Sequence, residues 1–359
     1  MKVFWSKDYA FSELSKASGI EYSSESTTGW GHLSSMMKDA LSVSGAILVD
    51  NVEDADIELY LGQAMTYTHP LMSPSAAFTM NETTSYPKAW VDSYNNFDSV
   101  IAPTPWGVSV LKESGIVKPL HSVSLCVDKN KFPFFERDYD DHWVFLVQTL
   151  NMTDRKNGRI VADLFHPTKM PSDCYLYLKT NPPSGLDSLV FDVNPNMKIV
   201  HSKMPFNDML GKVYNASHVS VNPSSGEGFG FLPCEHMSTG MMSLMTKFSA
   251  FSDLLELGVG LPIDCKMVES NTVIGGQWCM PEPKSLYDTM IWTYENRSKS
   301  MELGREYSKY IHDNFSVEKM GERICTILEG LILSKDKVLH NKGYQYMLDF
   351  VRSMTDNMV

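Results

Sequence analysis

Two successive series of short apolar segments, alternating with helical patterns, constrain the fold of this chain more than any other feature. The first series contains residues 1–5, 55–62, 76–80 and 98–102, and the second contains 143–149, 174–179, 198–201, 218–222 and 241–245. Strands that alternate with helices predict parallel sheets with helices on both faces. A length of 359 residues also favours two domains. We therefore expect an α/β chain of two Rossmann-like domains, with a ligand site at the carboxyl ends of the strands in the cleft between them.

A polar stretch over residues 128–142 separates the two series and predicts a linker. We expect an N-terminal domain over residues 1–135, a C-terminal domain over 136–325, and a helical tail over 326–359 that packs back on the first domain. Local helix signals are clearest after residue 103. Thr104 followed by Pro105 predicts a helix start, and Gly115 predicts its end.

Charge and composition exclude several classes of protein. The chain has 31 basic and 43 acidic residues, which gives a net charge of −12. This charge disfavours sequence-independent nucleic-acid binding but does not exclude a local basic patch. No run of about 20 apolar residues predicts a transmembrane helix. The first residues lack the apolar core of a signal peptide, so we expect a cytoplasmic protein. The six cysteines form no CxxC pair and are expected to be reduced, buried thiols.

The segment that carries chemistry is residues 221–240, VNPSSGEGFGFLPCEHMSTG. Its glycines allow a ligand to approach the backbone closely. A helix is expected to begin near Leu232, and its free N–H groups suit a diphosphate. Glu227 and Glu235 can each accept hydrogen bonds from sugar hydroxyls. The segment therefore predicts a loop that holds a sugar and a ribose around one diphosphate.

This segment resembles the donor-binding element of retaining GT-B glycosyltransferases, in the branch that contains glycogen-synthase-like and mannosyltransferase-like enzymes. The shared pattern is two glutamates separated by seven residues, here Glu227 and Glu235. Other parts of the chain that are similar to this branch are residues 80–90, 100–115, 123–128, 155–157 and 314–316. The resemblance covers roughly residues 76–325. It implies the GT-B fold, with C-terminal helices that return to the first domain.

The resemblance also implies roles for individual residues. Glu227 would bond the donor sugar, Glu235 the ribose hydroxyls, and Lys156 with Arg155 would neutralise the diphosphate. Further donor contacts would come from Asn157, from the backbone of Gly228, Phe229, Gly230 and Phe231, and from a first-domain glycine loop that contains Gly29 and Gly31. Glu82 is a candidate polar contact or base.

The reaction implied is transfer, with retention, of a sugar from a UDP- or GDP-linked donor to an acceptor hydroxyl. The departing diphosphate would be stabilised by Lys156, Arg155 and a helix N-terminus, with no metal and no other cofactor. The sequence does not identify the acceptor, and four classes are considered: a glycan, a lipid-linked glycan, a protein and a hydroxymethylated nucleobase. The acidity of the chain disfavours the nucleobase without excluding it.

Two departures from the family pattern bear on whether the chain is catalytic. Asn151 stands where the family has an arginine that Arg155 would replace, and the segment from Asn81 to Thr83 stands where many members have a histidine. These departures keep open a non-catalytic sugar-nucleotide-binding or assembly protein of the same fold. An epimerase or a phosphorylase of the same architecture also stays open. A dinucleotide-binding loop is disfavoured because the glycines lack the GxGxxG spacing. The pair Asp54 and Asp56 is interpreted as an acidic strand start and not as a metal-nucleotide motif.

Overall fold

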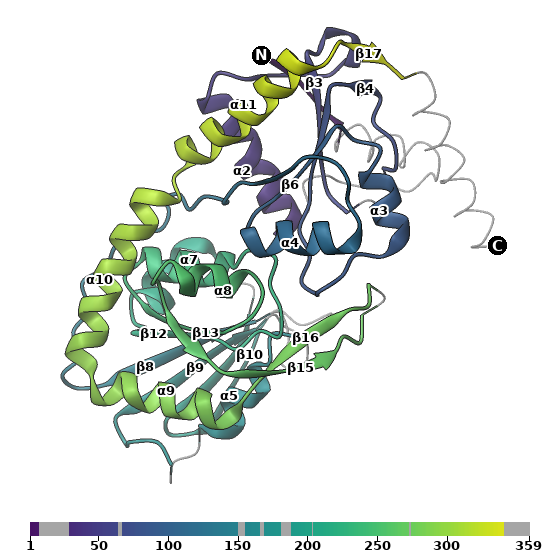
Figure 1. Cartoon of the computed structure of the whole chain (residues 1–359). Helices are drawn as coiled ribbons and strands as arrows, with labels where there is room; N and C mark the ends of the chain where they lie inside the picture. Colours follow the sequence, from purple (N-terminus) through teal and green to yellow (C-terminus); the bar gives the residue numbers. More distant parts are fainter. Residues whose placement is uncertain are drawn as a thin grey trace. The chain divides into compact units, whose positions relative to one another are not determined.

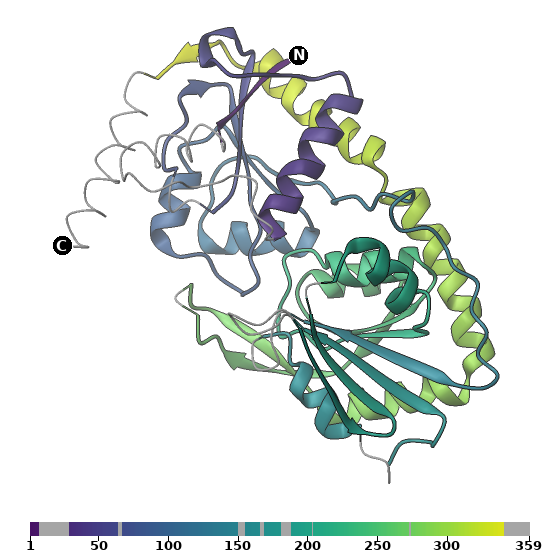
Figure 2. The same cartoon turned by 180° about the vertical axis from the view of Figure 1, so that it is seen from behind.

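The computed structural model describes residues 1–6, 29–63, 67–149, 155–165, 169–180, 188–202, 204–272 and 274–340. The chain divides into two compact units. The first comprises Met1–Cys126, Asn271–Gly276 and Val317–Val359, and the second comprises Val127–Ser270 and Gln277–Ser316. Each unit is a sheet with helices packed on it (Figures 1 and 2). The sequence predicts the corresponding boundaries at residues 135 and 325.

The first unit has a parallel six-stranded sheet in the order β2-β1-β3-β5-β6-β7. Its strands are β1 (Lys2–Trp5), β2 (Ile47–Val49), β3 (Ile57–Leu61), β5 (Ser75–Phe78), β6 (Ser99–Ala102) and β7 (Leu120–Ser122). Its helices are α2 (Gly29–Val43), η1 (Val52–Asp54), α3 (Lys88–Tyr94), α4 (Pro105–Ser114) and α11 (Val317–Ser334), and β17 (Val338–Leu339) pairs with β4 (Met72–Ser73). The C-terminal helix α11 packs on α2, where Gly321 lies directly against the backbone of Ala40.

Local sequence signals set the limits of α4. The side chain of Thr104 accepts a hydrogen bond from the Gly107 amide at 3.1 Å, which satisfies one of the free donors of the first turn. Gly115 ends the helix at φ 107°, in the left-handed region. The predicted start and end of this helix are both confirmed.

A buried carboxylate fixes one loop of the first unit. Glu58 lies on β3 with no exposed surface. Its carboxylate accepts hydrogen bonds from the Tyr67 hydroxyl at 2.7 Å and from the amides of Leu71 and Met72 at 2.7 and 3.2 Å. Burial raises the pKa of Glu58 to about 7, against the effect of these donors. The carboxylate therefore ties the segment before β4 to the central strand.

The second unit has a seven-stranded sheet in the order β10-β11-β9-β8-β12-β13-β14, parallel except for β10. The strands are β8 (Trp143–Gln148), β9 (Cys174–Thr180), β10 (Ser188–Asn194), β11 (Met197–Ser202), β12 (Val219–Asn222), β13 (Met242–Thr246) and β14 (Leu261–Ile263). The helices are α5 (Gly158–Leu164), α6 (Phe206–Asp208), η2 (Met209–Tyr214), α7 (Phe231–Ser238), α8 (Ala250–Glu256), α9 (Pro283–Glu295) and α10 (Arg297–Asn314). Helix α5 packs with α9, and α7 packs with α10. A separate hairpin consists of β15 (Cys265–Glu269) and β16 (Gln277–Pro281).

Three expectations differ from the structure. Gly29 and Gly31 do not form a loop, because they lie in the first turn of α2. The predicted helical tail over residues 326–359 is helical only as far as Ser334, and β17 follows at Val338–Leu339; residues 341–359 of the tail lie outside the described residues. The interpretation of Asp56 as part of an acidic strand start is not among these differences. Its side chain accepts a hydrogen bond from the Lys2 amide at 2.7 Å.

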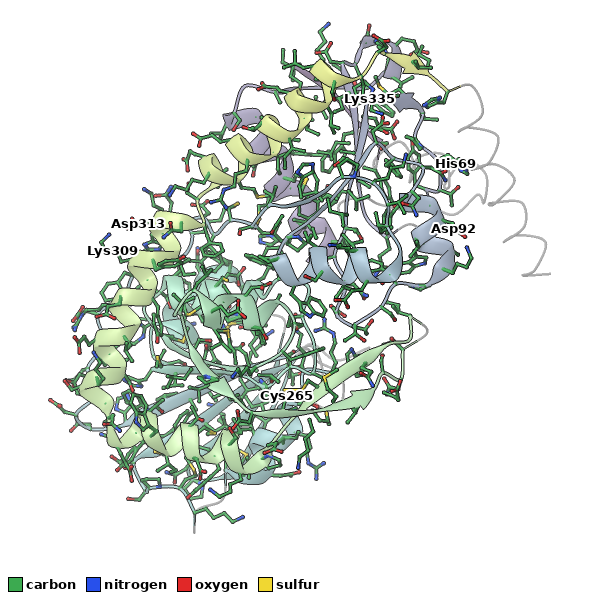
Figure 3. The ribbon with its side chains drawn as sticks, in the orientation of Figure 1. His69, Asp92, Cys265, Lys309, Asp313 and Lys335 are labelled. Carbon is green, nitrogen blue, oxygen red and sulfur yellow. A yellow bond between two sulfur atoms is a disulfide. The ribbon has the colours of Figure 1, made fainter. Side chains whose placement is uncertain are left out.

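The cysteines are the third difference. Cys265 and Cys279 form a disulfide across the β15–β16 hairpin, with their Cα atoms 5.5 Å apart, whereas the sequence predicts that all six cysteines are reduced (Figure 3). The reason is strand register: Met267 pairs with Cys279, so Cys265 lies close to it. The other four cysteines are buried and form no disulfide, as expected.

Among the described helices, none is both long enough and apolar enough to cross a membrane.

Candidate active site

The glycine-rich segment forms the loop that joins the central strand β12 to helix α7. Helix α7 begins one residue earlier than predicted, at Phe231, and Gly230 precedes it with φ 104°. A Cβ atom at Gly230 would lie 2.8 Å from the Phe251 ring. The loop therefore needs glycine at this position for both backbone conformation and space.

Replacing Gly230 by alanine is expected to lower the free energy of unfolding by about 2 kcal/mol or more, because a left-handed alanine is strained and its methyl group meets Phe251. Gly258 offers a matched control, since it has φ 79° in the same unit but nothing within 4 Å of a Cβ atom. Urea unfolding of both variants checks the prediction. Equal losses of unfolding free energy in the Gly230 and Gly258 variants would show that the contact with Phe251 does not destabilise the protein.

Glu227 is the centre of a buried ionic cluster in this loop. Its Oε1 atom accepts hydrogen bonds from Arg155 Nη1 at 2.8 Å, from Lys156 Nζ and from the Ser224 hydroxyl. Among the described residues, no hydrogen bond reaches its Oε2 atom. Burial acts to raise the pKa of Glu227, but the charges of Arg155 and Lys156 outweigh it and hold the pKa well below its usual range. The carboxylate is therefore ionised, with one oxygen left to accept from a ligand.

Hydrogen bonds tie the segment that carries the two cations to the glycine-rich loop. The Ser225 amide donates to the Arg155 carbonyl at 2.7 Å. The Asn157 side-chain amide donates to the Pro223 carbonyl at 2.9 Å and to the Ser225 hydroxyl at 2.7 Å. The resemblance implies a donor contact for Asn157, but its amide bonds within the protein and holds the loop in place.

Glu235 lies on α7 and is half-buried. Burial raises the pKa of its carboxyl to about 8. Burial raises the pKa of Tyr214, and the charge of Glu235 raises it further; the Tyr214 hydroxyl donates to Gln148 Oε1 at 3.0 Å. Gln148 ends β8, so this group of polar side chains also lies at the carboxyl end of the sheet.

The aromatic residues of the motif pack inward. Phe229 is buried, and its ring lies 5.4 Å from that of Phe231 and 6.1 Å from that of Phe315, measured between centroids. Because the ring is buried, the donor contact that the resemblance implies would have to be made by the backbone of Phe229, and this contact stays a prediction.

The remaining candidates lie in the first unit. Glu82 follows β5, where its amide donates to Asn81 Oδ1 at 2.8 Å. Asn81 in turn donates to the Ser85 carbonyl at 2.5 Å and so shapes this loop. Gly29 and Gly31 lie on α2. Asn151 lies outside the described residues.

Two cavities in the second unit differ in chemistry. The one at the motif is small, ≈ 20 Å³, and its lining includes Lys156, Ser224, Glu227 and Gly230. The other is ≈ 700 Å³ and lies at the amino ends of the strands, with a lining that includes Tyr175 and Lys198. The first is the candidate active site because the ionic cluster lies in its wall. No group of three His, Cys, Asp or Glu side chains suited to a metal ion occurs in the described part of the chain.

No family model matches this sequence, and no curated protein matches it significantly. Solved structures do match. The chain is similar to Anabaena HepE in complex with UDP-glucose, with a TM-score of 0.60 and 14% identity over 92% of this chain and 100% of that one. It is also similar to a glycosyltransferase from Rickettsia africae, with a TM-score of 0.56 and 11% identity over 93% of this chain and 99% of that one. Sucrose-phosphate synthase from Thermosynechococcus elongatus gives a TM-score of 0.59 and 10% identity over 78% of this chain and 75% of that one.

These neighbours share the GT-B fold, and the chain has that fold. The expected fold class is therefore confirmed.

Proposed function

We propose that this chain is a glycosyltransferase that moves a sugar from a nucleotide-diphosphate donor to an acceptor hydroxyl with retention of configuration. The observation that carries the proposal is the buried Glu227 cluster with Arg155 and Lys156, in the strand-to-helix loop of the second unit of a GT-B fold. Uridine is the favoured base, because the HepE structures hold UDP-glucose, or UDP and glucose. The acceptor would be a glycan, a lipid-linked glycan, a protein or a modified nucleobase.

The cluster supplies what this reaction needs. The bond between the anomeric carbon and the diphosphate oxygen breaks, and the nucleoside diphosphate leaves with added negative charge. Arg155 and Lys156 carry the two positive charges that stabilise it, together with the free amides at the start of α7. The acceptor oxygen forms the new bond to the anomeric carbon and passes its proton to the departing diphosphate. Glu227 would accept hydrogen bonds from the sugar hydroxyls through Oε2, and Glu235 from the ribose.

We also propose that transfer needs no metal ion, because Arg155 and Lys156 would supply the positive charge that a metal ion would otherwise bring to the diphosphate. Activity is expected to persist in excess EDTA. A requirement for Mg²⁺ or Mn²⁺, restored by adding back the ion, would contradict this part of the proposal.

The first experiment is a thermal-shift screen against nucleotide sugars and NAD(P), on the wild type and on Glu235→Ala. A ligand at 100 times its dissociation constant should stabilise the wild type by about 2.7 kcal/mol. We expect one nucleotide sugar to do so and the variant to lose the shift. Glu256→Ala, which replaces an exposed glutamate on α8 of the same unit, is the matched control and should keep it. A shift with NAD(P) alone, or with none of the panel, would overturn the proposal.

The nucleotide sugar found in that screen also distinguishes a transferase from the non-catalytic sugar-nucleotide-binding protein. A transferase should release the free nucleoside diphosphate slowly from its donor even without acceptor, by hydrolysis. Donor binding with neither transfer nor hydrolysis would favour a sugar-nucleotide-binding protein.

A further inference from the structure

The β15–β16 hairpin contacts the glycine-rich loop two residues before Glu227. The Cys279 amide donates to the Ser225 carbonyl at 2.9 Å. The next residue of the strand, Met280, has its sulfur atom 3.2 Å from the Ser225 hydroxyl. The strand that carries one half of the disulfide is therefore hydrogen-bonded to the candidate active site.

Ser225 connects this strand to the segment that carries the two cations. Its amide donates to the Arg155 carbonyl, and its hydroxyl accepts from the Asn157 side chain, both at 2.7 Å. A shift of the strand at Cys279 thus reaches the backbone that positions Arg155 and Lys156.

Besides the disulfide, the two strands are joined by backbone pairing and by exposed side-chain contacts, Gln277 to Glu269 at 2.8 Å and Lys266 to Glu282 at 3.0 Å. No residue of β15 is buried, and Met267 and Val268 are 47% and 37% exposed. A two-stranded sheet is at best marginally stable on its own in water, and here it is β16 that packs on the rest of the unit, with Cys279 and Pro281 buried and contacts to β13. The covalent link from Cys265 to Cys279 is therefore the strongest constraint between its strands. Cys265 is half-buried, whereas Cys279 is only 4% exposed, so Cys265 is the more accessible of the two residues.

We propose that the Cys265–Cys279 disulfide is a redox-responsive site that sets the affinity of the glycine-rich loop for its nucleotide-sugar donor; this rests on the proposed function. A dithiol reductant attacks the sulfur of Cys265 and releases the Cys279 thiolate, which takes up a proton. The second thiol of the reductant then releases Cys265, so that the reductant becomes a disulfide and the protein gains two thiols. Reduction loosens the strand at Cys279 and with it the bond to Ser225.

The test compares the oxidised and reduced wild type in titration calorimetry with UDP-glucose. Loss of one such hydrogen bond should weaken binding about fivefold. Cys265→Ser should bind like the reduced protein under both conditions. Cys325→Ala, which removes a buried free cysteine of the first unit, is the control and should keep the full redox response. Equal affinities of the oxidised and reduced wild type would overturn the inference.

A second measurement does not depend on the donor. Hydrogen exchange of the amides in residues 224–230 should become faster on reduction of the wild type and should not respond to reductant in Cys265→Ser. Exchange that is unchanged by reduction would overturn the inference even where UDP-glucose binds. Faster exchange without binding of any nucleotide sugar would support the redox link while contradicting the proposed function.

Discussion

Replacing Glu227 by glutamine is expected to lower the free energy of unfolding by about 3 kcal/mol in the absence of ligand, because it leaves Arg155 and Lys156 partly buried without a counter-charge. Added UDP should then stabilise the variant more than the wild type, since its diphosphate supplies the missing negative charge. Transfer should nevertheless fall at least about 100-fold, because the amide holds the sugar hydroxyls less strongly.

The measurements are urea unfolding with and without UDP, and initial rates of transfer. Glu282→Gln is the matched control. Glu282 pairs with Lys266 at 3.0 Å, but both side chains are substantially exposed, so its loss should cost less than about 1 kcal/mol and should not depend on UDP. A Glu227 variant that UDP stabilises no more than the wild type would contradict competition between the carboxylate and the diphosphate for the same cations.

Elements with strong local signals could be predicted from the sequence. The cap at Thr104, the stop at Gly115 and the buried central strands follow from local chemistry and continuous apolar runs, and the structure confirms them. The β15–β16 hairpin is missed because its exposed residues give no apolar run. Its disulfide depends on a pairing that the spacing of the two cysteines does not reveal. The prediction of a loop at Gly29 and Gly31 is wrong because glycine, although unfavourable within a helix, is tolerated in a first turn.

The candidate site was predictable in its members but not in their contacts. The motif identifies Glu227, and the resemblance identifies Arg155 and Lys156, but their ion pairs join residues 71 or 72 positions apart. Ser225 is missed as a residue that fixes the loop, because a serine beside glycines is common in turns. Two adjacent serines directly before the motif were the available signal, since hydroxyls often bond nearby backbone groups.

The second large effect is a loss of stability in acid that originates at His218. This ring is 2% exposed, its Nδ1 atom accepts from the Val144 amide at 3.0 Å, and its Nε2–H donates to the Asp138 carbonyl at 2.8 Å. Burial lowers its pKa to about 4, and the charges of His142, Arg137 and Arg297 oppose its protonation as well. A proton on Nδ1 would also break the bond to Val144.

The sign follows from proton linkage. The unfolded chain takes up a proton at this residue near pH 6.5, whereas the folded chain does so only near pH 4. The stability that His218 contributes is therefore fully present above pH 6.5 and falls by about 3 kcal/mol as the pH decreases to 4. Glu58 has a raised pKa, so its protonation stabilises the folded chain as the pH falls. The quantity to measure is therefore the difference in free energy of unfolding between the wild type and a His218 variant.

The variant His218→Asn keeps an acceptor near the Val144 amide without a titrating ring. Its free energy of unfolding should be lower than that of the wild type at pH 7.5. This difference should become smaller when urea unfolding is repeated at pH 6, 5 and 4.5. The control His340→Asn, at an exposed histidine of the first unit, should have the same free energy of unfolding as the wild type at each of these pH values. A gap between His218→Asn and the wild type that stays constant from pH 7.5 to 4.5 would show that the His218 ring is not kept neutral by the fold, and that acid destabilisation must come from other groups.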